Sequence, residues 1–439
     1  MSNSSPSYSQ SSEVHVSSSS EEHASPSSEE HVSPEKQKAH KIIDEGDDNY
    51  RPGGFHPVYI GDVYNNRYKI LNKIGYGVYS TVWVVKDLQS QTGGRREFLA
   101  LKVLRADCYG IDHDIFEREI LKHLRDADQG GDRKVYGYNH ITHLVDDFEH
   151  DGPNGTHVCL VFELYGETLR SFGAPFDGCM IPTCLMRSIM FQLLCALDFA
   201  HEHGVIHTDI QPSNIFVKFR DHSLIESQYL KEAPAPHQDR DEKHYKAIPS
   251  RPFCGYYCSD PENVLDFEFV LGDWGVASWT DKHLTNLIQP VALRAPEGLI
   301  GAPWDKSTDI WNLGAVLLEL YRAVRMFDGR ARWNDPYQLR YHLAEIVNFF
   351  GPFPKSLLEK GNPEIVQDMF DEEGRVKGMP FYDRPPLDSE WFLPDLTQEK
   401  KESFLEFFRS MMKIDPDERP SAEDLTFTPW VGITLKPRD

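Results

Sequence analysis

The chain has 439 residues, of which 40% are hydrophobic, and its formal net charge is −23. The hydrophobic content is sufficient for a sizeable core. The negative charge argues against direct nucleic-acid binding, because a phosphate backbone is recognised by a basic face, and it favours basic protein partners. The N-terminus lacks an apolar leader and no run of about 18 apolar residues is present, so we expect neither secretion nor a membrane span.

Seven cysteines are scattered along the chain and none of them forms a C-x-x-C pair. This distribution favours free thiols in a reducing compartment over a disulfide framework. Cys254 and Cys258, with three residues between them, could form half of a zinc site, but no suitable His partners accompany them. We therefore expect no zinc site.

Residues 1–45 are rich in Ser, Glu and His and contain no Leu or Phe. Such a segment cannot bury enough apolar surface to offset the entropy that ordering costs, so we predict a disordered Ser/Glu-rich tail. The Ser-Pro pairs of a short near-repeat, at Ser25 and Ser33, are candidate phosphorylation sites, although a solvating tail is the simpler interpretation.

A pair of strands that begins at Tyr68 is predicted to contain a glycine-bearing turn. Gly75 and Gly77 allow the backbone to turn tightly and to approach phosphate groups. Ser80 stands where a third glycine would complete a G-x-G-x-x-G pattern. The residues expected to cover a nucleotide are Ile74, Gly75, Tyr76, Gly77, Val78, Tyr79, Ser80, Thr81 and Val82.

Lys102 is the single charged residue of the next apolar strand, at 98–103, which also contains Ala100. A buried Lys requires a partner. Glu119 is the preferred partner, because it lies on a helix that is predicted to follow from apolar residues at three- and four-residue spacings. Glu117, on a neighbouring face of the same helix, is the second candidate.

Two further strands are predicted at 143–148 and 158–162, and they lead into Glu163, Leu164 and Tyr165. The family resemblance described below implies that these three residues connect two halves of the domain and present backbone groups to a bound base. A long helix with apolar periodicity follows.

The tight loop His207–Asn214 carries an Asp and an Asn five residues apart. This pattern suits phosphoryl transfer, in which Asp209 accepts a proton from the attacking hydroxyl and Asn214 holds a metal ion that bridges phosphates. Asp273, at the end of a later predicted strand, supplies a second metal-binding carboxylate.

Several segments resemble motifs of eukaryotic protein kinases. The loop H-T-D-I-Q-P-S-N resembles the family's H-R-D-L-x-x-x-N catalytic loop. The other segments follow in the family's order, namely D-W-G at 273–275, A-P-E at 295–297, D-I-W-N-L-G at 309–314 and D-P-D-E-R-P at 415–420. The resemblance implies that Asp309 anchors the catalytic loop and that Arg419 pairs with Glu297 in a buried, structural ion pair.

The resemblance implies an α+β fold of two lobes, in a kinase domain at 68–430. The β-rich N-lobe would cover about 68–163 and the mainly helical C-lobe about 166–430. An insertion at about 220–265 contains Pro and charged residues with little periodicity, so we expect it to be a surface excursion.

The resemblance also implies ATP and Mg²⁺ as cofactors. Asp209 would accept the proton, Asn214 and Asp273 would hold magnesium, and Lys102, oriented by Glu119, would bind the α- and β-phosphates. The expected catalytic residues are Asp209, Lys102 and Gln211, and the expected ATP-binding residues are 74–82 with Ala100, Lys102, Glu119, Glu163 and Tyr165.

Finer segments resemble the SR-protein kinases, which phosphorylate serines in the Arg-Ser repeats of splicing factors. These segments are G-Y-G-V-Y-S-T-V-W at 75–83, H-T-D-I at 207–210, A-S-W-T-D-K-H-L-T at 277–285 and E-G-L-I-G at 297–301. The resemblance implies a serine/threonine protein kinase that acts on basic, Arg-Ser-rich proteins. It further implies a monomer in the cytoplasm, with entry into the nucleus as a second location.

Two residues of the catalytic loop depart from the common pattern. Thr208 stands where many kinases have an Arg that binds a phosphorylated activation segment, so we expect activity without such phosphorylation. Gln211 stands where a Lys usually contacts the transferred phosphoryl group. By analogy with the loss of one transition-state donor, the barrier would rise by roughly 3 kcal/mol, about a hundredfold in rate.

The acidic docking residues of the SR-protein kinases are absent from the segment 341–350, where Tyr341 and Asn348 stand at the matching positions. Candidate replacements are Asp335, Glu345 and an acidic cluster that consists of Asp368, Asp371, Glu372 and Glu373.

Two alternatives remain open. One is a weakly active or inactive pseudokinase scaffold, which Gln211 and Ser80 favour, and the other is a different Arg/Ser-directed kinase of the same broad group. The scaffold is disfavoured by the presence of the four residues most needed for metal and phosphate chemistry, Lys102, Asp209, Asn214 and Asp273.

Overall fold

The computed structural model describes residues 44–432, except for 92–93, 95, 110–114, 128–131, 175, 177–179, 241–244, 259–265, 323–324, 333, 380–384, 391 and 395. The predicted disordered tail therefore lies, apart from its last two residues, outside the described residues. The described residues belong to one compact unit.

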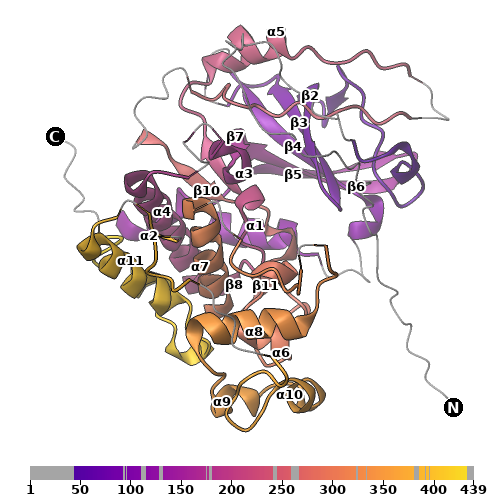
Figure 1. Ribbon diagram of the computed structural model, residues 1–439. Coiled ribbons are helices and arrows are strands. Elements are labelled where there is room, and N and C mark those ends of the chain that lie inside the picture. Colours follow the sequence, from indigo (N-terminus) through magenta and orange to yellow (C-terminus); the bar gives the residue numbers. More distant parts are fainter. Residues whose placement is uncertain are drawn as a thin grey trace, which may run out of the picture. The chain divides into compact units, whose positions relative to one another are not determined.

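The N-lobe is built around an antiparallel sheet with the strand order β1-β2-β3-β4-β6-β5 (Figure 1). Branched and aromatic side chains, which suit a pleated and half-buried surface, fill both faces of its central strands. The strands are β1 (Val63–Tyr64), β2 (Tyr68–Tyr76), β3 (Ser80–Asp87), β4 (Phe98–Leu104), β5 (Leu144–Gly152) and β6 (Gly155–Glu163). Helices α1 (Glu117–Asp126) and α2 (Asp132–Tyr138) lie between β4 and β5 in sequence.

The C-lobe is mainly helical, so the α+β fold of two lobes is confirmed. Its two long central helices are α4 (Thr183–Glu202) and α7 (Ser307–Arg322), and both bury most of their side chains. The other helices are α3 (Leu169–Phe172), α5 (Leu230–Glu232), α6 (Pro296–Ile300), α8 (Leu339–Phe350), α9 (Lys355–Leu358), α10 (Pro363–Met369), α11 (Gln398–Met411) and α12 (Ala422–Thr426).

Two small sheets in the C-lobe bring distant parts of the chain together. The first contains β7 (Tyr165–Thr168), β9 (Ile215–Lys218) and β10 (Phe269–Leu271), and the second contains β8 (Val205–Ile206) and β11 (Ser278–Trp279). Ile215 of β9 pairs with Leu271 of β10, and the Gly272 amide donates to the Asn214 carbonyl at 2.8 Å. This register places the end of the catalytic loop beside Asp273.

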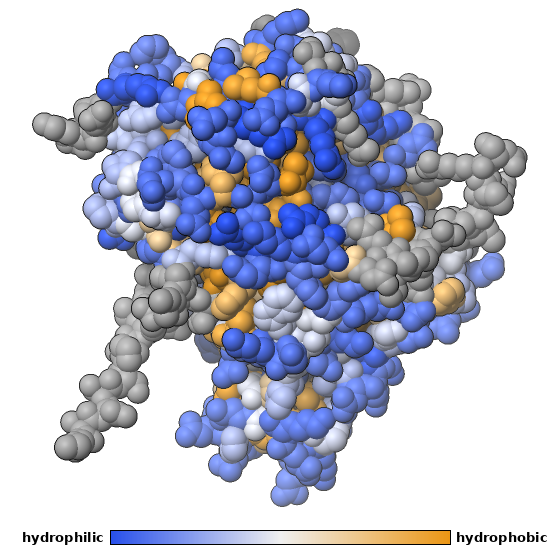
Figure 2. Space-filling model, turned by 180° about the vertical axis from the view of Figure 1, so that it is seen from behind, coloured by the Kyte–Doolittle hydropathy of each residue, from blue (hydrophilic) through white to orange (hydrophobic). Residues whose placement is uncertain are grey.

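Helix α4 is, among the described residues, the one helix that is long and apolar enough to cross a membrane by length and composition. In this fold 67% of its most apolar window is buried inside the protein. Packing against α2, α7, α12 and β10 explains its apolar character as that of a core helix. Figure 2 shows the molecule from behind the view of Figure 1, and this face is largely hydrophilic, with scattered apolar patches.

The insertion between β9 and β10 is not a simple surface excursion, and that expectation was wrong. Its residues Tyr229, Ile248 and Phe253 are buried, and Ile248 joins the apolar cluster of the N-lobe sheet. In Figure 1 its helix α5 lies beside that sheet. The sequence did not indicate this burial, because the insertion contains prolines and extended segments. Irregular backbone of this kind produces no hydrophobic periodicity in the sequence.

Three hydrogen bonds attach the insertion directly to β2, and one of them runs from Lys73 Nζ to the Ile248 carbonyl at 3.1 Å. The Asn72 side-chain amide donates to the Ala233 carbonyl at 2.9 Å, and the Arg251 amide donates to the Lys73 carbonyl at 2.7 Å. The strand is irregular at these residues, since its register with β3 shifts on either side of them. The irregularity therefore coincides with the place where the insertion binds.

Three histidines pack together at the end of the N-lobe sheet. The His56 ring lies 4.7 Å from that of His150 and 4.8 Å from that of His157, with Tyr64 at 5.8 Å. His56 Nδ1 and His157 Nε2 are buried without a hydrogen-bond partner among the described residues. Burial and the two neighbouring imidazoles lower the pKa of His56 from 6.5 to about 3.

This cluster should make the fold sensitive to acid. The unfolded chain binds a proton at His56 below pH 6.5, whereas the folded chain does so only below about pH 3. The contribution of His56 is complete above pH 6.5 and is lost as the pH falls from 6.5 toward 3, by about 1.4 kcal/mol per pH unit. Between pH 7 and pH 5 we expect urea unfolding to show a loss of about 2 kcal/mol from this group.

The variant His56→Phe keeps an aromatic ring and cannot bind a proton. It should show a shallower loss of unfolding free energy over the same pH range, while His237→Phe, at a side chain that is 87% exposed, should behave like the unchanged protein. Equal slopes for all three proteins would contradict the assignment of acid sensitivity to His56.

Candidate active site

The β2–β3 hairpin carries the glycine-bearing turn, with Val78 72% exposed at its tip. The expected tight turn is confirmed, since the Gly77 amide donates to the Ser80 carbonyl at 2.8 Å, although neither Gly75 nor Gly77 has a positive φ angle. A Cβ at Gly75 would meet nothing within 4 Å, and one at Gly77 would meet only the Ser80 hydroxyl at 3.9 Å. These glycines leave open space, which is what a closely approaching ligand needs.

A side chain at Gly75 should therefore impair ligand binding without disturbing the fold. Because an added methyl that intrudes into occupied space costs about 1–3 kcal/mol, Gly75→Ala should raise KM for ATP about tenfold. Thermal unfolding without nucleotide should be unchanged. A normal KM in Gly75→Ala would show that the turn does not approach the nucleotide closely.

Lys102 on β4 pairs with Glu117, so the prediction of Glu119 as its partner was wrong. Its Nζ lies 2.7 and 2.9 Å from the two Glu117 carboxylate oxygens. Glu119 instead accepts a hydrogen bond from the Tyr109 hydroxyl. The correct residue was recoverable from the sequence, because Glu117 precedes Ile120, Leu121 and Leu124 by three, four and seven residues, and these four share the buried face of α1.

Lys102 also reaches across the cleft between the N-lobe and the C-lobe. Its Nζ lies 2.8 Å from a carboxylate oxygen of Asp273, the residue after Gly272 in the C-lobe. Lys102 lowers the pKa of Asp273, which keeps that carboxylate ionised. Burial alone would lower the pKa of Lys102, but Asp273 and Glu117 together raise it. The Asp273 side chain is 48% exposed and its backbone is left-handed, with φ of 60°, a strained state that recurs at functional sites.

The Asp309 carboxylate, at the start of α7, anchors the catalytic loop, as predicted. One oxygen of this buried carboxylate accepts from the His207 amide and the other from the Thr208 amide, both at 2.8 Å. Thr208 has a φ of 65°, and its hydroxyl donates to the Val276 carbonyl at 2.7 Å. The loop is thereby joined to the segment that follows Asp273.

Asp209 is surrounded by amide donors. Gln211 Nε2 lies 3.0 Å from each carboxylate oxygen, and Asn214 Nδ2 lies 2.8 Å from one of them. Burial raises the pKa of Asp209, against the lowering effects of His207 and the two amides. Gln211 therefore acts on the carboxylate of Asp209, a contact that the sequence pattern alone did not indicate.

The donor set fits magnesium better than a softer metal. Asp273 offers a carboxylate, and Asn214, whose amide nitrogen is bonded to Asp209, retains its carbonyl oxygen. Mg²⁺ prefers such hard oxygen ligands and often takes one or two of them together with substrate phosphates. Within the described residues no three His, Cys, Asp or Glu side chains converge as a metal cage, so the remaining ligands would come from the nucleotide and water.

Comparison with known families decides the assignment of this cleft. The model of the protein kinase domain matches residues 68–227 and 260–431, which is more than half of the chain. The chain belongs to the protein kinase family. The gap between the two matched segments falls within the insertion.

The relatives of this kinase are serine/threonine protein kinases, several of them of the SR-protein kinase type. It is 28% identical to protein kinase dsk1 of Schizosaccharomyces pombe, over 92% of this chain and 87% of that protein. It is 32% identical to a serine/threonine protein kinase of Aspergillus fumigatus, over 90% and 91%. It is 29% identical to the serine/threonine-protein kinase SRPK of Physarum polycephalum, over 89% of this chain and 91% of that protein.

A crystal structure of a kinase domain shares the fold, with a TM-score of 0.58 and 20% identity over 86% of this chain and 99% of that one. The resemblance to SR-protein kinases is thus confirmed, and the chain is a serine/threonine protein kinase.

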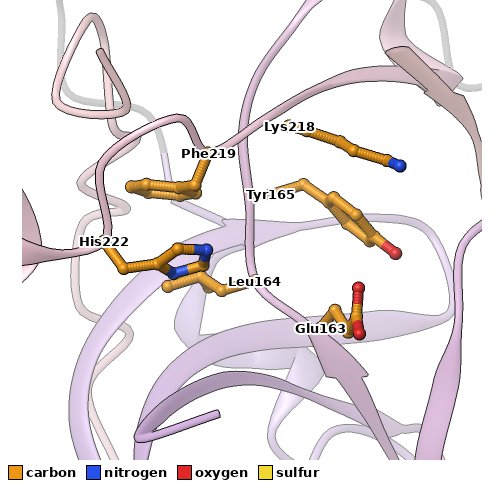
Figure 3. Close-up of a pocket in the computed structure, with 6 residues that line it drawn as sticks. All are labelled: Glu163, Leu164, Tyr165, Lys218, Phe219 and His222. Atoms are coloured by element: carbon orange, nitrogen blue, oxygen red, sulfur yellow. The ribbon is translucent and has the colours of Figure 1, made fainter. Parts of the chain in front are cut away.

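The predicted hinge residues Glu163, Leu164 and Tyr165 run from the end of β6 into β7. Together with Lys218, Phe219 and His222 they line a small pocket of about 10 Å³ (Figure 3). This volume holds about one water molecule, so the pocket is too small for a nucleotide base. The Glu163 carboxylate lies 3.6 Å from a ring nitrogen of His143.

The activation segment of the kinase is held by its own polar contacts. The Gln289 amide nitrogen donates to the Thr308 carbonyl at 2.9 Å, and its oxygen accepts from the Ala295 amide at 2.8 Å. Arg294 donates to the carbonyls of Ile288 and Gln289 at 2.8 and 3.0 Å. These bonds hold residues 288–295 together and attach them to the start of α7.

The candidate docking acids differ in availability. Glu345 is 2% exposed and accepts from the Asp328 and Gly329 amides, so its proposed docking role was wrong. Asp368 pairs with Arg340 at 3.3 Å. Asp371 accepts from two backbone amides of the following turn. Asp335 is half-buried, whereas Glu372 and Glu373 are exposed.

Proposed function

We propose that this kinase transfers the γ-phosphate of ATP, with Mg²⁺, to serines of basic, Arg-Ser-rich proteins. The observation that carries the proposal is the convergence of four side chains from separate segments. Lys102 lies 2.8 Å from Asp273, and Asn214 lies 2.8 Å from Asp209. The register between β9 and β10 brings the two pairs to one edge of the cleft.

In this proposal each residue has a distinct task. Asp209 accepts the proton of the substrate hydroxyl, and the amides of Gln211 and Asn214 orient its carboxylate. Lys102, oriented by Glu117, binds the α- and β-phosphates, and residues 74–82 cover the nucleotide beside Ala100. Asn214 and Asp273 would hold magnesium, which would supply positive charge to the transferred phosphoryl group. Adenine would contact the backbone of Glu163 and Tyr165.

The substrate class is supported by charge and by the relatives. The net charge of −23 attracts basic partners, and one relative bears the name SRSF protein kinase 3 (Homo sapiens, 25% identical over 88% of this chain and 89% of that protein). A groove of about 480 Å³ between α9 and α10 is lined by two acidic residues and one basic residue, Glu359, Glu372 and Lys355, together with the apolar Leu358 and Val366. Such a groove suits a peptide with Arg side chains.

We further propose that the kinase works as a monomer in the cytoplasm and enters the nucleus. Activity without phosphorylation of the activation segment belongs to the same proposal, because Gln289 and Arg294 already hold that segment. A pseudokinase scaffold is the second candidate, favoured by the neutral amide of Gln211 in place of a Lys.

The test is transfer of labelled phosphate from Mg-ATP to three peptides: an Arg-Ser repeat, an acidic Ser peptide and a Ser-Pro peptide. We expect selective labelling of the Arg-Ser repeat, lost in Asp209→Ala and weakened in the double variant Glu359→Gln/Glu372→Gln. Labelling of another peptide would discard the substrate class and keep the kinase. Binding of ATP without any labelling would favour the scaffold, and Gln211→Lys would then be the first variant to restore transfer.

A further inference from the structure

Helix α1 begins without a capping residue of its own. Its N-cap residue, Phe116, has no side chain that can accept from the exposed amides of the first turn. Tyr109, which belongs to the preceding loop, fills this place. Its hydroxyl accepts from the Arg118 amide at 2.9 Å and donates to a Glu119 carboxylate oxygen at 2.6 Å.

This arrangement performs the function of a capping box with a side chain from outside the helix. In a capping box, one side chain accepts from an amide of the first turn while an acidic side chain at the third helical position accepts in return. Glu119 holds that third position in α1. Burial and Glu119 raise the pKa of Tyr109, so its hydroxyl remains protonated and continues to donate.

The rest of α1 is held by other groups. The Arg118 guanidinium donates to Asp147 at 2.6 Å, and Lys122 pairs with the same carboxylate at 2.8 Å. The His123 ring contacts the His203 carbonyl at 2.8 Å. Lys122 and His123 fix the middle of the helix against β5 and the end of α4. In the first turn, the Arg118 side chain binds β5, and Tyr109 binds the Arg118 backbone amide.

We propose that Tyr109 is a positioning residue for the ion pair between Lys102 and Glu117, acting through the first turn of α1. Glu117 is the first residue of the helix, adjacent to the amide that Tyr109 binds. A first turn that loses its cap frays, and Glu117 then no longer holds Lys102 in one place. The phosphate-binding role of Lys102 on which this inference rests is part of the proposed function.

The predicted effect concerns ATP rather than the protein substrate. Loss of one helix cap costs about 1 kcal/mol, so Tyr109→Phe should lower kcat/KM for ATP about fivefold. KM for the peptide should stay unchanged, since α1 lies on the nucleotide side of the cleft. A role in general stability alone would not lower kcat/KM for ATP while leaving KM for the peptide unchanged.

The matched control is Tyr256→Phe. Tyr256 donates to a Glu232 carboxylate oxygen at 2.7 Å, a bond of the same kind that lies in the insertion, and its removal should leave kcat/KM for ATP unchanged. Glu119→Ala should lower kcat/KM like Tyr109→Phe, and the double variant should be no worse than either single one, because the two residues form one unit. Glu119→Gln keeps an accepting oxygen and should restore most of the value.

The inference is overturned if Tyr109→Phe, folded with an unchanged melting temperature, turns over ATP like the unchanged protein, or if Tyr256→Phe is equally impaired. Should Tyr109→Phe fail to fold, Glu119→Ala compared with Glu119→Gln decides the same question. Should the unchanged protein transfer no phosphate, the proposed function fails. The positioning role is then tested by the Kd for Mg-ATP, which Tyr109→Phe should raise about fivefold.

Discussion

Replacing Asp209 by Asn should lower kcat by a factor of about 10² to 10⁴, the range that a positioned proton acceptor contributes. The loss has two causes. An amide cannot accept the proton of the substrate hydroxyl, and its NH₂ group would face the donors of Gln211 and Asn214, which lie 2.8 to 3.0 Å from the present carboxylate oxygens. The measurement is steady-state transfer from ATP to an Arg-Ser peptide at saturating concentrations of both substrates.

A suitable control for Asp209→Asn is Asp221→Asn, which changes an acidic residue of the insertion that caps its own turn through the Ser223 amide. This variant should retain normal turnover, and the melting temperature of Asp209→Asn should remain close to that of the unchanged protein. Turnover within about threefold of normal in Asp209→Asn would exclude the proton-acceptor role, since general-base catalysis contributes far more.

The buried ion pair between Arg419 and Glu297 should produce the largest effect on stability. Both side chains have no exposed surface, and their two parallel bonds are 2.7 Å long. The other N–H groups of Arg419 donate to the carbonyls of Lys413, Ser307 and Ile414. Arg419→Ala would leave Glu297 charged and unpaired in the interior, which costs about 3–5 kcal/mol.

Urea unfolding at pH 7 measures this loss. The control is Asp417→Asn, which breaks a pair with Lys360 whose two side chains are 72% and 47% exposed. A surface pair of this kind contributes little to stability, because water screens both charges. If the two variants were destabilised equally, the buried pair would have no special importance for the fold of the C-lobe.

The sequence was most informative where the chemistry depends on short spacings. Asp209 and Asn214 lie on one loop, so their short spacing predicted their proximity, whereas the pairing of β9 with β10 that brings Asp273 beside them appeared only in the structure. For Asp309 the resemblance to protein kinases supplied the prediction, and the carboxylate does accept hydrogen bonds from the catalytic loop.

The features that the sequence did not predict depend on contacts between distant segments. The capping bond from Tyr109 crosses a loop and has no periodic signal. The burial of Glu345 is set by the amides of 328 and 329, which approach α8 only in the folded C-lobe. For Glu119 the error was one of helical phase, since it does not share the face formed by Glu117, Ile120 and Leu124.

The insertion changes the mechanics of this kinase. It leaves the C-lobe after β9, binds β2 of the N-lobe through Ala233 and Arg251, and returns to the C-lobe at β10. Besides the hinge, the described parts of the insertion therefore also attach one lobe to the other, whereas a hinge alone would leave the lobes free to rotate about it. Rotation of one lobe against the other has to strain or break these attachments, so the opening of the cleft has fewer degrees of freedom than in a kinase joined at one point.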